Sequence, residues 1–568
     1  MQAELARLEQ ICQSLQLNTQ ATFTRQWLAT QRTDLNVLYL PGVTAEIDAT
    51  NPQQQNWSAA FQAARNRYAA TLFSEAKRLA AEGEEAESFR VLWQVLREDP
   101  EHAEAKRILG TLASAATVKP RLRKGQTPHP EFGWPAGSYS RIETPHFLLT
   151  TRGDPRQSVD LAQLMERYYA LWRQVFYPLW ATPGMLANKF EGRNTPWEKA
   201  REMEVVLLRD RQDYLQVLGV AEQNASVSVG YYAPHKKMSF FFAAPDYEAT
   251  LFHELTHQLF AEATNIDARS DAGSLGGVWL TEGIALYMES LVNRGTYWTL
   301  GGIDAPRLQT ARYRAVRDGY WADWEPFTKG HVEDWKQDSK IALLYTQACG
   351  LTHLYMDQLS QPAARESLFR ALVGVYQNQL SFDELRVMLG SDDEACQLFY
   401  QQALTLNDVN VRALCHAGLT SQSLVLTGSQ LSPESWQELK SLAAGLTWLD
   451  VSFTNAKSND LAWVSSAGKL ERLSLEGTSC DGEILKQVAQ LTRLKELDLT
   501  GCAINDDSLQ ILAGHSQLET LWLSKTHVSN AAIETLGKLP QLKFCEIEGT
   551  NISPAVWQRF SQSKSLGK

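Results

Sequence analysis

The string His-Glu-Leu-Thr-His at residues 253–257 combines residue types that bind a metal ion and activate water. Leucine recurs at every fourth position through this stretch, which predicts a buried helix, with Asp246 after Pro245 as its N-cap. On that helix, His253 and His257 lie one turn apart on the same face, so both imidazoles can reach one ion. Glu254 lies beside them, positioned for a water molecule rather than for the metal.

A catalytic metal site needs a third protein ligand, and Glu282 is the candidate. It lies in the string Trp-Leu-Thr-Glu-Gly-Ile-Ala, which predicts a second helix. Gly283 inside this helix costs about 1 kcal/mol relative to alanine, which makes sense if another element, such as the metal-bearing helix, approaches the backbone closely. Glu289 faces the same way as Glu282 and could orient a histidine ring. We expect it to be an exposed charge, because most helix carboxylates are solvated.

The two helices together resemble the gluzincin peptidases, in which an HExxH helix is followed by a helix that supplies a glutamate ligand, often within an EGxA-like string. The resemblance covers about residues 141–400 and extends to gluzincin aminopeptidases and to uncharacterised bacterial peptidase-like domains. It implies one Zn²⁺ ion held by His253, His257 and Glu282, with Glu254 as the general base. Glu282 follows His257 by 25 residues, longer than the usual gluzincin spacing, so the extra residues predict a loop insertion.

The same resemblance gives Tyr345 a role. In such gluzincins a tyrosine that starts a YxxGxxxxxL-type helix donates a hydrogen bond to the oxyanion, although Tyr345 has two extra residues before Gly350. A phenol opposite the metal would stabilise the tetrahedral intermediate by ~3 kcal/mol. A core tyrosine on an amphipathic helix is an equally good interpretation. Tyr231, Tyr232 and His353 are the alternative donors.

Residues 227–243 predict a β-hairpin that turns at 234–237. Gly230, Tyr231 and Tyr232 would then form an edge strand that pairs with an extended substrate through main-chain hydrogen bonds. Gluzincin aminopeptidases carry a GxMxN string at this place to hold the substrate amine, and the chain lacks it. We therefore expect an endopeptidase.

The expected reaction is zinc-assisted hydrolysis of a peptide or protein. Zinc lowers the pKa of a bound water to about 7 at comparable sites and polarises the scissile carbonyl. Glu254 takes the proton of the water and delivers it to the leaving amine. Two alternatives stay open: the chain is a non-catalytic interaction scaffold that retains a zincin fold, or the site hydrolyses another amide or an ester.

The elements that must position these residues predict a multidomain α+β chain. In the first part, residues 80–110 resemble one tetratricopeptide-type helical hairpin broken at Asp99-Pro100. A single hairpin cannot bury its own face, so we expect it to pack on its neighbours. The expected units are a helical region at 1–118, a linker at 119–140, a zincin-type metallopeptidase domain of mixed sheet plus helices at 141–415, and a repeat solenoid at 419–568.

The C-terminal part carries a leucine pattern with a period of 24 residues. The in-register positions that begin LxxLxL or a near match are Leu446, Leu470, Leu494, Leu518 and Leu542. The pattern resembles leucine-rich repeats and implies a curved α/β solenoid of parallel strands. Such repeats usually bind proteins on the concave face, so the resemblance implies a docking module. A rigid cap or spacer is the alternative.

Composition restricts the remaining possibilities. The net charge of −11 over 568 residues argues against a general nucleic-acid or anionic-membrane binder. Seven cysteines without CxxC spacing fit a reducing compartment. The first residues lack a signal peptide, and no apolar run is long enough to span a bilayer. We expect a cytoplasmic protein, or an exported one if a signal sequence has been removed.

Overall fold

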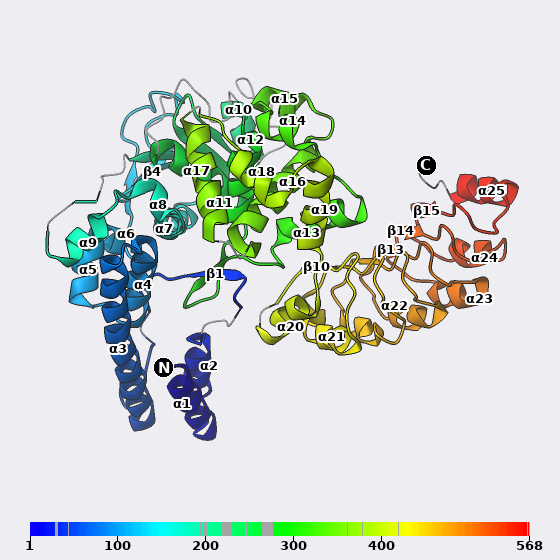
Figure 1. Ribbon diagram of the computed structural model, residues 1–568, viewed down its shortest axis with the longest axis horizontal. Coiled ribbons are helices and arrows are strands. Elements are labelled where there is room, and N and C mark those ends of the chain that lie inside the picture. The colour runs from blue at the N-terminus through cyan, green and yellow to red at the C-terminus, as the bar shows by residue number, and fades with distance from the viewer. Residues whose placement is uncertain are drawn as a thin grey trace.

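The computed structural model describes residues 1–28, 32–43, 45–193, 196–197, 202–218, 229–244, 247–263, 276–359, 362–377, 379–418, 420–564 and 566. Over these residues the chain is a mixed α+β protein in several parts: a helical arm, a central body and a curved solenoid (Figure 1). Some expected features lie outside the described residues, namely the helix start at Pro245 and Asp246, the first two residues of the hairpin at 227–243, and nearly all of the loop insertion at 265–277.

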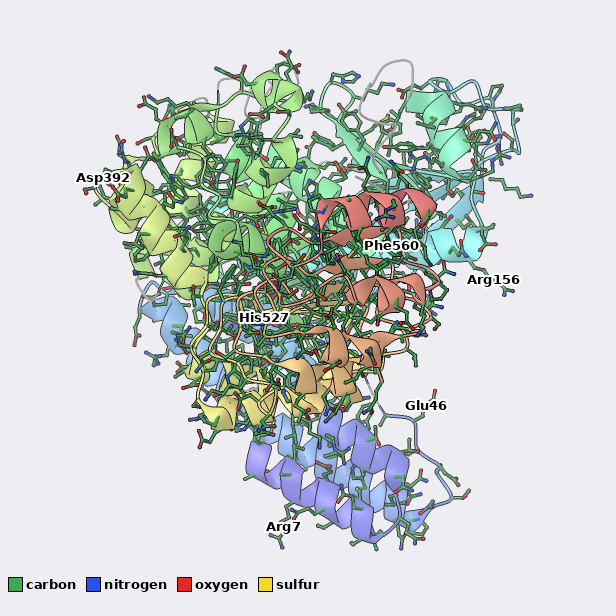
Figure 2. All side chains as sticks on the ribbon, turned by 90° about the vertical axis from the view of Figure 1, so that its right-hand side faces the viewer. Arg7, Glu46, Arg156, Asp392, His527 and Phe560 are labelled. Atoms are coloured by element: carbon green, nitrogen blue, oxygen red, sulfur yellow. The ribbon has the colours of Figure 1, made fainter. Side chains whose placement is uncertain are left out.

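The arm has a small hydrophobic core of its own, centred on Trp27, Trp57 and Phe61. Its helices are α1 (Gln2–Ser14), α2 (Asn18–Gln26) and the first half of α3 (Pro52–Ala81). Helix α3 begins where Asn51 accepts hydrogen bonds from two backbone N–H groups and Pro52 takes the first helical position. Figure 2 shows Arg7 of α1 at the outer end of the arm, away from the body.

The main hydrophobic core crosses the boundary that the sequence suggests at residue 118. The second half of α3 packs antiparallel to α4 (Glu85–Glu98), and the turn between them contains Gly83 at φ +88°. The expected break at Asp99-Pro100 separates α4 from α5 (Ala103–Leu109). Buried residues of α4 share one core with the body, because this hairpin packs on α7 (Pro155–Val175), α8 (Tyr177–Trp180) and α9 (Met185–Phe190).

A six-stranded mixed sheet forms the centre of the body, in the order β2-β3-β4-β5-β7-β6. Strands β4, β5 and β7 are parallel, while β6 runs antiparallel to β7 and is the last strand on its side among the described residues. The strands are β2 (Arg121–Lys124), β3 (Ser140–Glu143), β4 (Phe147–Thr151), β5 (Met203–Leu208), β6 (Gly230–Ala233) and β7 (Met238–Phe242). The expected hairpin is therefore present as β6 and β7.

The sequence suggests that the segment 119–140 is a linker, but this prediction is wrong. The segment forms the opposite edge of this sheet. Strand β2 pairs with β3, and Trp134 and Tyr139 are buried in a hydrophobic cluster beneath the sheet. The side chains of β2 are all exposed, so its basic residues are solvated as expected. Charged residues on an edge strand hinder that strand from pairing with another sheet. This role explains why the segment is basic although it is not a linker.

Helices that follow the sheet in the chain carry the residues that the sequence predicts to bind a metal ion. The three that matter most are α11 (Glu248–Ala263), α12 (Val278–Met288) and α16 (Ile341–His353). Helix α13 (Pro306–Arg312) packs on α16 and continues as a π-helical turn at Tyr313–Arg317. The remaining helices of the body are α6 (Thr111–Ala115), α10 (Arg211–Leu218), α14 (Trp324–Lys329), α15 (Val332–Gln337), α17 (Pro362–Tyr376), α18 (Asp383–Leu389) and α19 (Asp393–Leu404). Helix α20 (Asp408–His416) belongs to the solenoid, because its buried Val411 and Leu414 are part of the solenoid core.

A second, three-stranded sheet was not expected from the sequence. Strand β1 (Leu35–Leu38), from the N-terminal region, pairs antiparallel with β9 (Trp298–Gly301), which also pairs with β8 (Val292–Asn293). This pairing brings a segment from the start of the chain to the end of helix α12.

The solenoid consists of six parallel strands stacked in register. Successive strands β11 to β15 pair residues 24 positions apart, as Leu449 with Leu473, whereas Leu424 of the first strand pairs with Leu449, which is 25 positions away. The strands are β10 (Ser423–Val425), β11 (Trp448–Asp450), β12 (Arg472–Ser474), β13 (Glu496–Asp498), β14 (Thr520–Trp522) and β15 (Phe544–Glu546). Short return helices run along the outer side, as α21 (Pro433–Glu438), α22 (Leu485–Val488), α23 (Asp506–Leu509) and α24 (Ala532–Gly537), and α25 (Pro554–Lys564) ends the stack (Figures 1 and 2).

The described residues contain no helix long and apolar enough to cross a membrane.

Candidate metal centre

Helix α11 and helix α12 bring His253, His257 and Glu282 together, as the sequence predicts. One ligand atom from each residue lies within 4.8 Å of the others. The Nε2 atoms of the two histidines are 3.3 Å apart, and the Glu282 carboxylate lies 3.3 Å from His253 and 3.7 Å from His257. All three side chains are partly exposed, so water can reach the cluster.

The donor set fits a zinc ion. Ligand atoms about 2.1 Å from zinc at the corners of a tetrahedron lie roughly 3.4 Å apart, close to the separations of 3.3 and 3.7 Å observed here. Two imidazoles and one carboxylate fill three of four positions, which is the ligand count of catalytic rather than structural zinc sites. His253, His257 and Glu282 would therefore hold the ion and leave one position for water or substrate.

Glycine at position 283 allows helix α12 to approach α16. A Cβ atom there would lie 2.7 Å from the backbone oxygen of Ala348 and would also meet the Thr352 hydroxyl. The close neighbour is therefore α16, not the metal-bearing helix α11 that the sequence suggests.

Glu289 is not an exposed charge, contrary to the sequence-based expectation. Its side chain is 8% exposed, and its carboxylate accepts a hydrogen bond from Nδ1 of His253 at 2.9 Å. The other carboxylate oxygen accepts from Nε of Arg307 at 2.7 Å. Since Nδ1 of His253 is occupied, its Nε2 faces the cluster, which is how carboxylate partners orient metal-bound histidines.

The cluster concentrates negative charge. Burial alone would lower the pKa of His253, but hydrogen bonds to Glu282 and Glu289 outweigh it and raise this pKa to about 10. Burial would raise the pKa of Glu282, yet the charges of His257 and His253 bring it well below its usual range. The two histidines and their carboxylates thus form a site that attracts a cation. In the absence of a metal, this cation is the proton that His253 binds.

The remaining predicted groups surround the cluster. The Glu254 carboxylate accepts a hydrogen bond of 2.8 Å from the backbone N–H of Tyr232 on β6. The charge of Glu282, burial, the charge of Glu254 and a hydrogen bond with Glu282 raise the pKa of Tyr345 above its usual value. Tyr345, Glu254 and Gly230 line the same cavity.

Two alternative oxyanion donors are placed elsewhere. The Tyr231 side chain packs against the cluster of Phe240 and Ala233 on the other face of β6. The His353 side chain is fully buried, with its ring 4.8 Å from that of Tyr287 and its Nδ1 3.5 Å from Asp357. These positions exclude Tyr231 and His353 as donors to an oxyanion.

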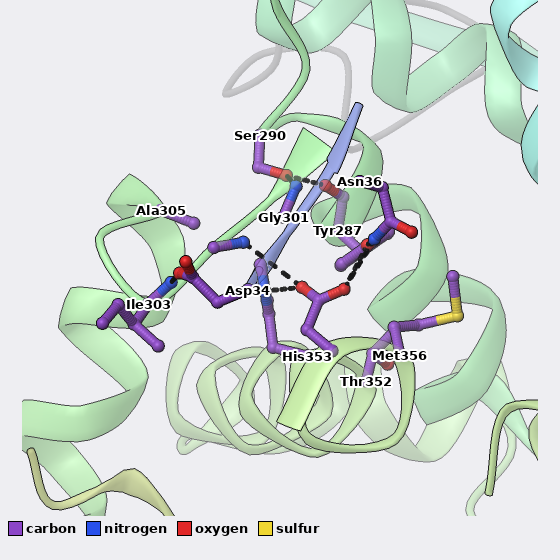
Figure 3. Close-up of polar contacts among 12 residues, drawn as sticks. Asp34, Asn36, Tyr287, Ser290, Gly301, Ile303, Ala305, Thr352, His353 and Met356 are labelled. Carbon is purple, nitrogen blue, oxygen red and sulfur yellow. Dashed lines mark hydrogen bonds and ion pairs between the residues drawn. The ribbon is translucent and has the colours of Figure 1, made fainter. Parts of the chain in front are cut away.

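A buried polar network at the end of helix α12 was missed by sequence reasoning (Figure 3). Tyr287 donates a hydrogen bond of 2.7 Å to Asp357, and Asn36 of β1 donates to both at 2.8 Å. Arg365 in turn donates to Asn36 at 3.1 Å. The network fixes α12 to the helix pair at 341–358 and uses the N-terminal strand to do so. No local pattern around Asn36 could have indicated it.

The cavity beside the cluster has a volume of about 450 Å³. Its charged and titratable lining residues include His253, Glu254, Glu289 and Tyr345, together with Arg307 of α13. The rest of the lining is apolar or carries hydroxyl groups. A larger cavity of about 790 Å³ lies between α8 and α17, and its lining contains none of the groups described above except Asp357 and Arg365.

Comparisons with known proteins assign no family. No protein-family model and no curated protein matches the chain. A solved internalin from Listeria monocytogenes is similar at 18% identity over 26% of this chain, with a TM-score of 0.19. The match covers 61% of the internalin, less than two thirds of its length. This likeness carries no argument about the metal centre.

Proposed function

We propose that the chain is a zinc-dependent peptidase that cleaves peptide bonds within an extended protein substrate. The observation that carries the proposal is the convergence of His253, His257 and Glu282 at separations of 3.3 and 3.7 Å. Glu254 and Tyr345, which line the same cavity beside the cluster, add the two groups that hydrolysis of an amide needs.

Zinc at this site would supply a Lewis acid that polarises the scissile carbonyl and acidifies the attacking water. Glu254 takes the proton from that water and returns it to the leaving amine. The hydrogen bond from the Tyr232 N–H holds one oxygen of Glu254 and leaves the other to accept the proton. Tyr345 is protonated at neutral pH, and its hydroxyl, which forms a hydrogen bond with Glu282, is the donor that this proposal assigns to the oxyanion.

Strand β6 supports cleavage within a chain rather than at its end. Its hydrogen bonds to β7 use one side of the strand, and the backbone N–H of Tyr232 points to Glu254 on the other side. An extended peptide that adds to this edge would lie across the metal centre. Main-chain pairing of this kind does not need a free terminus.

The solenoid serves as a docking module in this proposal. Its first strands contact the body, while Trp522 of β14 and Phe544 of β15 remain partly exposed at the far end. Aromatic residues are enriched where proteins bind one another, which supports docking on these last strands. A non-catalytic scaffold is the second candidate, and the hydrolysis assay below distinguishes the two.

The decisive test is Glu254→Gln, with zinc content measured in parallel. We expect one zinc per chain in both proteins and a fall in peptide hydrolysis of roughly a hundred- to ten-thousandfold, the contribution of general-base catalysis. Glu248→Gln changes an exposed carboxylate on the same helix and should leave both quantities unchanged. His257→Ala should remove the metal. Unchanged hydrolysis in Glu254→Gln would exclude the proposed role of Glu254.

A further inference from the structure

The side chain of Arg307 lies in the wall of the catalytic cavity with unused hydrogen-bonding capacity. Its Nε donates to Glu289 at 2.7 Å, and the side chain is 59% exposed. Among the described residues, no hydrogen bond or ion pair occupies its two Nη atoms. The fixed Nε bond holds the guanidinium plane in place, so its outer edge presents donors in a set direction.

The walls near Arg307 suit an aliphatic chain. Leu286 and Cys349 are buried and apolar, and burial raises the pKa of the Cys349 thiol well above its usual value, so it is uncharged. Thr310 and Thr346 contribute short hydroxyl-bearing side chains. A cavity of about 450 Å³ is large enough for one or two substrate residues with a charged tip beside the guanidinium.

Arg307 also determines the net charge of the site at which a substrate binds. The carboxylates of Glu254, Glu282 and Glu289 carry three negative charges, which a divalent ion and Arg307 together balance. Without the guanidinium, the site would be negative and would repel an acidic substrate group. With it, a carboxylate can enter beside Arg307 without net repulsion.

We propose that Arg307 is a specificity residue that binds a carboxylate of the substrate, within about three residues of the scissile bond. A guanidinium with both Nη atoms available can hold a carboxylate by two parallel hydrogen bonds, a geometry specific to this pair of groups. The two hydrogen bonds of 2.9 and 2.7 Å that connect His253 to Arg307 through Glu289 keep this anchor close to the metal centre. The inference rests on the proposed peptidase function and names its substrate class.

The carboxylate has two sources, an aspartate or glutamate side chain and the C-terminus of a peptide. The test therefore uses matched fluorescent peptides that differ only by Glu against Gln at one position, or by a free against an amidated C-terminus. Binding is measured by fluorescence anisotropy on zinc-loaded Glu254→Gln protein, in which cleavage does not interfere. Hydrolysis of the same peptides is measured on the unmodified protein.

We expect the carboxylate form of one peptide pair to bind roughly ten- to a hundredfold more tightly, the range for a hydrogen bond to a charged group. Adding Arg307→Gln should abolish this ratio while the amide peptide binds as before, and Arg307→Lys should retain part of it. If Arg307 had a purely structural role, its replacement would weaken the binding of both peptides equally. Equal binding of all matched peptides, or a ratio that survives Arg307→Gln, overturns the inference.

The outcomes for the two proposals are separable. Hydrolysis without a preference for a carboxylate contradicts the role of Arg307 and leaves the peptidase proposal standing. A carboxylate preference in binding without any hydrolysis contradicts the peptidase proposal and supports Arg307 as an anchor in a binding protein. Zinc content, measured for every variant, shows whether loss of the Arg307–Glu289 pair has disturbed the metal centre instead.

Discussion

Replacing Glu289 with glutamine keeps the shape of the side chain but removes the charge that faces His253. The carboxylate accepts from His253 at 2.9 Å and from Arg307 at 2.7 Å. A charge-assisted hydrogen bond contributes about 1.5–3 kcal/mol and a neutral one about half as much. The expected loss at His253 is therefore about 0.8–1.5 kcal/mol, which corresponds to a roughly four- to tenfold weaker affinity for zinc. The Arg307 bond adds little, because this side chain is 59% exposed.

The assay is competition for zinc against a chromophoric chelator at fixed pH. The matched control is Glu248→Gln, which changes an exposed carboxylate at the start of α11, the helix that carries His253. This variant should bind zinc as the unmodified protein does. Thermal unfolding of the metal-free proteins shows whether the substitution changes the fold. A dissociation constant for Glu289→Gln within twofold of the unmodified value would refute the role given to this carboxylate.

Two further predictions concern the same helices. Zinc must displace the proton that the carboxylates hold on His253, whose pKa is raised to about 10 in the metal-free protein. Zinc affinity should therefore rise about tenfold per pH unit between pH 6 and 9, and calorimetry in buffers of different ionisation enthalpy should show about one proton released per ion; binding that is independent of pH would contradict this. Gly283→Ala should destabilise the protein by about 1–3 kcal/mol, because the new Cβ meets α16. Gly468→Ala, with no heavy atom within 4 Å of the new Cβ, is the control, and equal shifts in urea unfolding would disprove the close approach.

Features that depend on neighbours in the chain could be predicted from the sequence. The pairing of His253 with His257 follows from the pitch of one helix, and the solenoid follows from a period of 24 residues. Each repeat touches only adjacent repeats, so the leucine spacing alone determines the register of strands such as β12 and β13. The hairpin of β6 and β7 is local in the same sense.

Features that depend on distant contacts could not be predicted. The segment 119–140 has the composition of a linker, and only its pairing with β3 and the burial of Trp134 make it part of the sheet. Glu289 has the sequence environment of a solvated helix end, and only the arrival of His253 and Arg307 from other helices buries it. Asn36 reaches the end of α12 because β1 pairs with β9, across more than 250 positions of the chain.

Helix α13 connects the two parts of the molecule that the sequence presents as separate. At its start, Arg307 supports the metal centre through Glu289. Five residues later, Arg312 is buried and donates to the backbone oxygen of Val425 in the first strand of the solenoid. The following π-helical turn places Arg317 within ion-pair distance of Glu476 and Asp498 on the strand side of the repeats.

Helix α13 contacts Glu289 through Arg307 and the first strand of the solenoid through Arg312. A rotation of the solenoid relative to the body would therefore break contacts of α13. Val425, Glu476 and Asp498 take part in this internal contact, so the proposed docking role falls to β14 and β15. In the proposed function, this arrangement would hold docking and catalysis at a fixed distance from each other, which favours substrates long enough to reach from the last repeats to strand β6.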